Sequence, residues 1–140
     1  MIKVIYLALL AGVIIFGSVV IVVTRATMKY DLEFQNPLFI VAAVLTAINI
    51  SAASVLHRIF FRVGGVPADA ETAQQKYQTF VLMRAALIEG AALFSATATM
   101  ITCNIMPAFP LILCVGALIM YRPSQQEFID LMSKAAGGKR

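Results

Sequence analysis

Apolar residues are grouped along the chain into four long runs that short polar segments separate. Within each run the apolar side chains surround a helix on all faces, which is typical of helices in lipid. Short connections make consecutive helices run in opposite directions. The pattern predicts an all-α membrane protein, a four-transmembrane-helix antiparallel bundle. Its spans, each close to the ~20 residues that cross a bilayer, are expected at about residues 4–23, 38–56, 79–101 and 105–121.

Two features near the first and third runs refine this prediction. The first run is about twice as long as the apolar core of a signal peptide, so we interpret it as an uncleaved span. Before the third run, Asp69 is a suitable N-cap for a helix that begins near Ala70. We expect that helix to continue without a break into the third span.

The C-terminal segment predicts one further helix. Ser124 and Glu127 have the spacing of a capping box, which starts helices. We expect a short amphipathic, cytoplasmic helix over about residues 125–134. The chain then forms a single domain over residues 1–134, followed by a frayed tail at residues 135–140.

Composition supports a membrane environment. Hydrophobic residues form 61% of the chain, against roughly 45–50% in soluble domains, and charged residues form 13%, against about 25%. A soluble fold needs more polar residues to cover its surface, so these proportions exclude an ordinary soluble domain. The net charge of +4 comes from basic residues at the edges of the apolar runs. This placement favours the lipid bilayer as partner and argues against nucleic acid.

Basic residues are divided unevenly between the two sides of the predicted bundle. The 24–37 loop and the 102–106 turn carry two of them, Arg25 and Lys29. Because cytoplasmic loops are enriched in Lys and Arg, the other side is predicted to be cytoplasmic. We expect a multi-pass protein of the inner (plasma) membrane with both termini in the cytoplasm. The N-terminus, the 57–78 loop and the tail together carry Lys3, Arg58, Arg62, Lys76, Arg122, Lys134, Lys139 and Arg140.

Glu89 is the one acidic residue inside a predicted span. It lies about ten residues into the third span, roughly 15 Å deep, where an ionisable group costs on the order of 3 kcal/mol. One interpretation is a proton or cation site. The other is a neutral, protonated carboxyl that joins two helices by hydrogen bonds. Asn49, at a similar depth on the adjacent second span, is its expected partner.

Arg84 also lies within the third span, about 8 Å from its cytoplasmic end, and completes the candidate intramembrane polar site with Glu89 and Asn49. Side chains on a helix point toward its N-terminus, which is cytoplasmic for this span. We therefore expect Arg84 to extend toward the headgroups, as basic side chains near the ends of spans do. An ion pair with Glu89 is disfavoured because the two residues lie about 140° apart around the helix.

Small residues recur at four-residue intervals in several spans, a spacing that lets helices approach closely. We expect most of them to pack inside the bundle, while one set could instead serve an oligomer. The first span carries Ala8 and Gly12; the second carries Ala43, Ala47 and Ser51; the third carries Ala86 and Gly90, and also Ala91, Ser95 and Thr99.

Catalytic and metal-binding sets are incomplete. His57 is the only histidine, and Cys103 and Cys114 form no CxxC motif. A membrane enzyme would have to use His57, Arg58 and Arg62 at the cytoplasmic edge, with no evident acid–base partner. We predict no metal, no cofactor and no enzymatic activity.

Two stretches carry a family resemblance: R-A-A-L-I-E-G-A-A-L-F over residues 84–94 and Y-R-P-S over residues 121–124. They resemble an R-x-A-L-x-E-G-x-x-L-F stretch and an R-P-[ST] tail start in a family of small, uncharacterised bacterial membrane proteins familiar from the Bacteroidetes. The resemblance covers roughly residues 70–132. It implies a four-span bacterial protein and brings no known activity.

The segment from Ala86 through Glu89 to Phe94 is also similar to an A-L-x-E-x-x-x-[IL]-[YF] pattern. That pattern occurs in the ion-binding helix of rotary ATPase proteolipid subunits, and the resemblance implies a proton or sodium site at Glu89. The chain departs from those subunits in two ways. Its first span has only Gly12 and Gly17 in place of a glycine ladder, and its carboxylate is on an odd-numbered span.

These observations lead to two functional hypotheses. The first is a structural or accessory protein that contacts headgroups, a protein partner or a second copy through Arg58, Arg62 and Arg122. The rival is a proton or cation translocator that uses Glu89 as carrier and Asn49 as helper.

Overall fold

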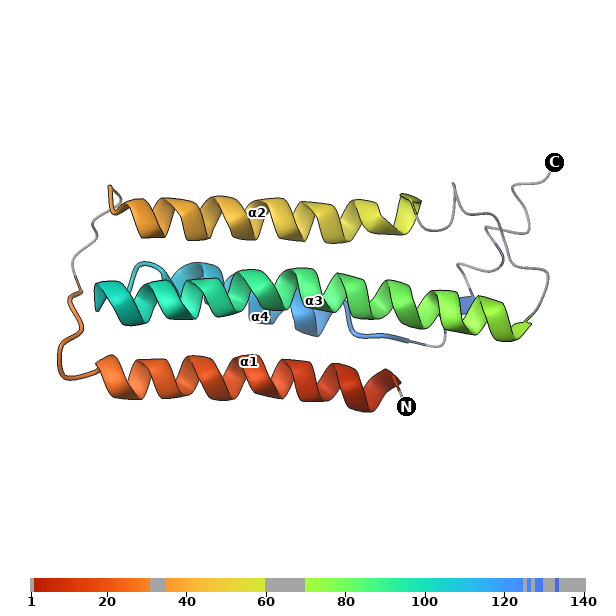
Figure 1. Ribbon diagram of the computed structural model, residues 1–140, viewed down its shortest axis with the longest axis horizontal. Helices are drawn as coiled ribbons and strands as arrows, with labels where there is room; N and C mark the ends of the chain where they lie inside the picture. Colours follow the sequence, from red (N-terminus) through yellow and green to blue (C-terminus); the bar gives the residue numbers. More distant parts are fainter. Residues whose placement is uncertain are drawn as a thin grey trace.

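The computed structural model describes residues 2–30, 35–59 and 70–124, together with residues 126, 128, 129 and 133. Apart from one isolated bridge, their regular structure is helical, so the all-α prediction is confirmed. Three helices are long and apolar enough to cross a membrane, and the fourth is a shorter apolar helix. In chain order these are α1 (Ile2–Thr24), α2 (Pro37–Arg58), α3 (Ala70–Thr102) and α4 (Ala108–Met120) (Figure 1).

Local sequence explains where several helices begin. The side chain of Asn36 accepts a hydrogen bond from the Leu38 amide at 3.0 Å, and Pro37 occupies the first turn of α2. α3 runs unbroken from Ala70, as expected. α4 begins three residues later than predicted, because Asn104 accepts a hydrogen bond from the Met106 amide at 3.0 Å and holds that segment in a turn.

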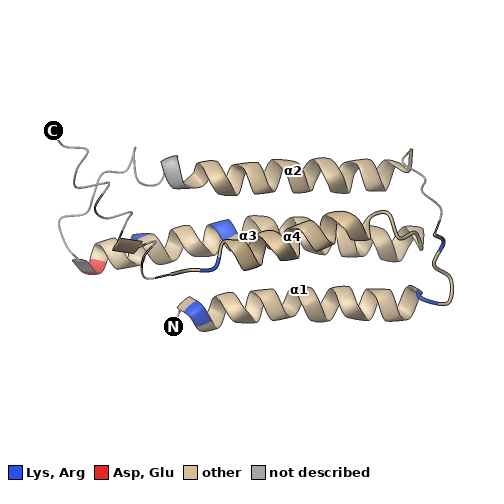
Figure 2. Cartoon of the chain, turned by 180° about the vertical axis from the view of Figure 1, so that it is seen from behind, with Lys and Arg blue, Asp and Glu red and all other residues tan. Residues whose placement is uncertain are grey.

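α3 is the central helix of the molecule. It packs against each of the other three helices. α1 and α2 lie on its two sides, and α4 lies behind it in Figure 1 and in front of it in Figure 2, which is drawn from the back. Its inward positions are almost fully buried, and they include Ala91, Ser95 and Thr99, so packing by this predicted set is confirmed. The other buried positions of α3 include Phe80, Val81, Ala85, Ile88, Ala92 and Ala96.

At one end of the molecule, backbone hydrogen bonds join the segment after α1 to the turn between α3 and α4. The Lys29 amide donates to the Cys103 carbonyl at 2.7 Å, and the Ile105 amide donates to the Lys29 carbonyl at 3.2 Å. Cys103 adopts a left-handed conformation, with φ of 48°, where α3 ends. The α1–α2 connection and the α3–α4 turn therefore lie together.

The helices differ greatly in length. At 1.5 Å per residue, α1 and α2 are about 34 and 33 Å long, close to the ~30 Å hydrocarbon thickness of a bilayer. α3 has 33 residues and α4 has 13, which correspond to about 50 and 20 Å. α3 is thus longer than a bilayer core, and α4 is shorter than the 105–121 segment that we expected.

Part of the predicted structure lies outside the described residues. This applies to Asp69, to Arg62, to Glu127 and most of the 125–134 segment, and to residues 135–140. The tail helix and the frayed tail therefore stay predictions.

Candidate functional site

Arg84 turns toward the N-terminal end of α3, over the Phe80 ring, as its place on the helix predicts, but it is buried, with 4% of its surface exposed, and meets protein groups. Its Nη2 atom donates a hydrogen bond to the Tyr121 carbonyl oxygen at 2.7 Å. Its guanidinium carbon lies 5.0 Å from the centre of the Phe80 ring and 4.9 Å from that of Tyr121. The side chain points across to the end of α4, which sequence reasoning did not foresee.

The shortness of α4 explains this arrangement. α4 ends at Met120 and has no basic residue in its last turn, so its C-terminal carbonyls need a donor and a positive charge. Arg84 supplies both from α3. The two flanking rings add favourable cation–π contacts, each worth on the order of 0.5–2 kcal/mol.

Aromatic residues extend this contact toward the tail. The Tyr77 hydroxyl donates to the Ser124 carbonyl at 3.3 Å, and its ring meets Phe128 edge-on at 5.2 Å between centres. Tyr77, Phe80 and Arg84 recur at i, i+3 and i+7, so they share one face of α3. That spacing is the sequence signal that could have located the cluster. We call Tyr77, Phe80, Arg84, Tyr121 and Phe128 the α3–tail clasp.

Glu89 and Asn49 are both half-buried, but the structure does not join them. Over the described ranges, neither side chain makes a hydrogen bond or an ion pair. Arg84, the third member of the expected polar site, is engaged at the end of α4. Glu89 instead lies beside Gly90, at the border of the exposed face of α3.

Three buried hydroxyl groups of α1 and α3 are satisfied within their own helices. Thr24 donates to the Val20 carbonyl at 2.7 Å, and Ser95 and Thr99 each donate to the carbonyl four residues earlier at 2.9 Å. Hydroxyls bonded in this way are held against their own helix. They contribute no hydrogen bonds between helices.

The small residues Ala86 and Gly90 lie on an exposed face of α3 instead of packing inside the bundle. A Cβ atom at Gly90 would meet nothing within 4 Å, which shows how open this face is. This set therefore does not pack inside the bundle, as we expected of most sets, because α1 and α2 flank α3 and leave this side uncovered (Figure 1). The outer face of α3 comprises Thr79, Met83, Ala86, Gly90, Leu93 and Thr97.

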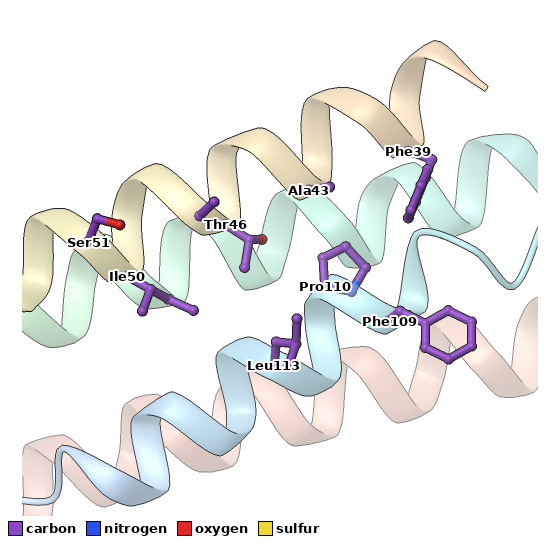
Figure 3. A pocket seen from close by; sticks show the side chains of 9 residues that line it. Phe39, Ala43, Thr46, Ile50, Ser51, Phe109, Pro110 and Leu113 are labelled. Atoms are coloured by element: carbon purple, nitrogen blue, oxygen red, sulfur yellow. The ribbon is translucent and has the colours of Figure 1, made fainter. Parts of the chain in front are cut away.

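The other predicted small-residue set lines a groove between α2 and α4 with a volume of about 360 Å³. Figure 3 shows side chains of the two helices facing this space from opposite sides. Thr46 and Cys114 lie 3.7 Å apart between oxygen and sulfur and join the helices. The lining is mainly apolar, so the groove suits an apolar group. It consists of Phe39, Ala43, Thr46, Ala47, Ile50, Ser51, Phe109, Pro110 and Leu113.

A second cavity, of about 290 Å³, lies between the start of α1 and the end of α4. Lys3 and Arg122 are both exposed and are part of its lining. Three arginines were expected at headgroup or partner contacts, and the structure describes the side chain of one of them, Arg122, at this cavity. Arg58 is the last residue of α2, but its side chain is outside the described part, as is all of Arg62.

The described residues contain no group of three or more His, Cys, Asp or Glu side chains that could hold a metal ion. Comparison of the chain with protein-family models, with curated proteins and with solved structures finds no match.

Proposed function

We propose that this chain is a four-pass inner-membrane protein with an accessory, non-enzymatic role. Its outward surface supports membrane insertion, because large apolar side chains are exposed along the helices. Examples are Val4 at 69%, Ile112 at 66% and Met120 at 85%. An apolar surface of this extent is suited to lipid or to partner helices.

Charge placement supports cytoplasmic termini. Lys3 and Arg122 line one cavity and therefore share one end, while Arg25 and Lys29 lie near the opposite end. Figure 2 shows α1 and α4 without charged positions along their lengths, apart from the basic first turn of α1, and shows basic positions in the connections that follow both helices. With the basic residues of the tail, the first end is the richer in Lys and Arg, which is the cytoplasmic pattern.

The α3–tail clasp supports a fourth pass despite the shortness of α4. Non-helical backbone at membrane depth is tolerated where protein groups satisfy it. Arg84 satisfies the Tyr121 carbonyl in this way, and the segments on either side of α4 then supply the remaining length.

The outer face of α3 is the observation that carries the accessory role. This face belongs to the central helix, and it presents Ala86 and Gly90, where a second helix can approach closely. Glu89 and Asn49, which a transport path would need, are not joined by a hydrogen bond, and Arg84 is bonded to the end of α4. Binding to another membrane helix, from a partner or a second copy, is the function that this arrangement supports best.

Substitution of Gly90 tests this role. Gly90→Leu should abolish the association of the chain with its partner or copy, because the added side chain blocks close approach. Gly12→Leu is a matched control, since a Cβ at either glycine meets nothing within 4 Å. Blue-native electrophoresis of mild detergent extracts would measure the assembly. Identical assembly of both variants and the parent chain would contradict the proposal.

The competing translocator hypothesis draws on the position of Glu89 at the edge of the same face. Purified protein in liposomes, with an enclosed pH-sensitive dye, measures proton flux directly. We expect the flux to equal that of protein-free liposomes. Flux that Glu89→Gln removes would replace the accessory role with translocation.

A further inference from the structure

The cavity between α1 and α4, which we call the α1–α4 cleft, combines two kinds of lining. Lys3 and Arg122 supply two positive charges from segments far apart in the sequence. Leu7, Leu10 and Ile119 supply an apolar wall that continues along the helices. Leu7 and Ile119 are each 58% exposed, so the apolar part opens to the outside of the bundle.

Two close contacts fix α1 against α4, one beside the cleft and one further along the helices. The Tyr6 ring is 3% exposed, and its hydroxyl donates to the Leu118 carbonyl, which fixes α1 against α4. Further along the same pair of helices, Gly17 would place a Cβ 3.0 Å from a methyl carbon of Leu111. The helices thus meet closely at Gly17 and at Tyr6, and the cavity lies beside the Tyr6 contact, between the start of α1 and the last turn of α4 with the residues that follow it.

We infer that the α1–α4 cleft binds one anionic phospholipid, with the phosphate between Lys3 and Arg122 and an acyl chain along Leu7, Leu10 and Ile119. Basic pockets between membrane helices on the cytoplasmic side bind acidic headgroups in this way. The volume of about 290 Å³ is near the lower end for ligand pockets. It suits a headgroup and the first part of a chain, the rest of which stays in the bilayer.

Charge complementarity decides between lipid classes. Two exposed cations at one mouth favour a lipid of net negative charge over a zwitterionic one, whose own ammonium would face them. A free phosphate would use only the cations and leave the apolar wall uncovered. The inference rests on the membrane placement proposed above and is independent of the accessory role.

Native mass spectrometry of the full chain in mild detergent tests the inference. The chain is titrated with phosphatidylglycerol or phosphatidylcholine, and the first bound lipid is measured. We expect phosphatidylglycerol to bind more tightly, and a Lys3→Gln, Arg122→Gln double variant to lose about fivefold in affinity for each charge removed. The matched control, Arg25→Gln with Lys29→Gln, removes the same charge at the opposite end and should bind as the parent does.

Two further measurements are needed. One distinguishes a lipid phosphate from free phosphate, and the other tests whether the apolar wall holds the acyl chain of the lipid. Inorganic phosphate should not displace the lipid, whereas equal competition by phosphate would assign the cleft to free anions. Ile119→Trp and Leu7→Trp fill the apolar wall at exposed positions and leave both cations in place. Each should reduce phosphatidylglycerol binding severalfold, with helical content followed by circular dichroism.

Three outcomes would overturn the inference: equal binding of both lipids, equal loss in the control variant, or unchanged binding in folded tryptophan variants. The first would leave membrane placement standing, since the chain would still retain lipid. A chain that retains neither lipid would count against membrane placement itself.

Discussion

At the scale of single residues, Arg84 shows how burial can make a charged side chain structural. Its guanidinium contacts the Tyr121 carbonyl and two aromatic rings, and 4% of its surface is exposed. Arginine suits this role because its planar group stacks on rings while it donates several hydrogen bonds. Lysine has the charge but cannot reproduce this geometry.

Loss of this side chain should destabilise the chain and loosen its tail. Arg84→Ala leaves the Tyr121 carbonyl without its donor, and we expect a loss of roughly 1.5–3 kcal/mol, the range for a hydrogen bond to a charged group. Thermal unfolding in detergent would measure the loss, and chymotrypsin cleavage after Phe128 would report the loosened tail, because the Phe128 ring packs on Tyr77 within the clasp. Arg84→Lys should restore only part of the stability. Unchanged cleavage in Arg84→Ala would contradict a clasping role.

The neighbours of Glu89 depend on how the helices pack and not on the residue itself. Its position in an apolar run marks it as unusual, but nothing in the run shows which neighbour it faces. In the structure it borders the outer face of α3 and makes no hydrogen bond with Asn49. The residue type predicted importance, whereas the packing of α1 and α2 decided its surroundings.

At the scale of elements, the glycines of α1 have different surroundings. Gly17 is buried, with a methyl carbon of Leu111 3.0 Å from where its Cβ would stand, while Gly12 is exposed and open. Sequence spacing singled out Gly12, with Ala8, as a packing position. The crossing of α1 and α4 decides that Gly17 takes this role instead.

Paired substitutions measure this difference. Gly17→Val should separate α1 from α4 and cost about 1–3 kcal/mol, the usual range for overpacking. Gly12→Val carries the same change in helix propensity but adds no contact, so its effect should stay within about 0.5 kcal/mol. Thermal unfolding of both variants in one detergent is the measurement. Equal destabilisation would mean that propensity, and not helix contact, sets the cost.

At the scale of the whole molecule, the proposed topology depends on whether α4 crosses the bilayer. With four passes, Lys29 faces outward and Ser124 faces the cytoplasm; with three, both positions face outward. In cells that express a chain with both cysteines replaced by serine, a membrane-impermeant maleimide should label Lys29→Cys and spare Ser124→Cys until the membrane is permeabilised. Glu71→Cys is the control, because it is cytoplasmic in either topology. Labelling of Ser124→Cys in intact cells would show three passes.

The sequence by itself determined that the protein is helical and apolar, where most of its helices lie, and that α3 begins near Ala70. These properties follow from local composition, hydrophobic runs and helix caps, which act within a few residues. Only the tertiary structure decided the role of Arg84, the exposure of Ala86 and Gly90, and the meeting of Lys3 with Arg122. The physical reason is that helices apolar on all sides carry no stripe to orient them. Their rotation and neighbours are therefore set by packing between segments that are distant in the chain.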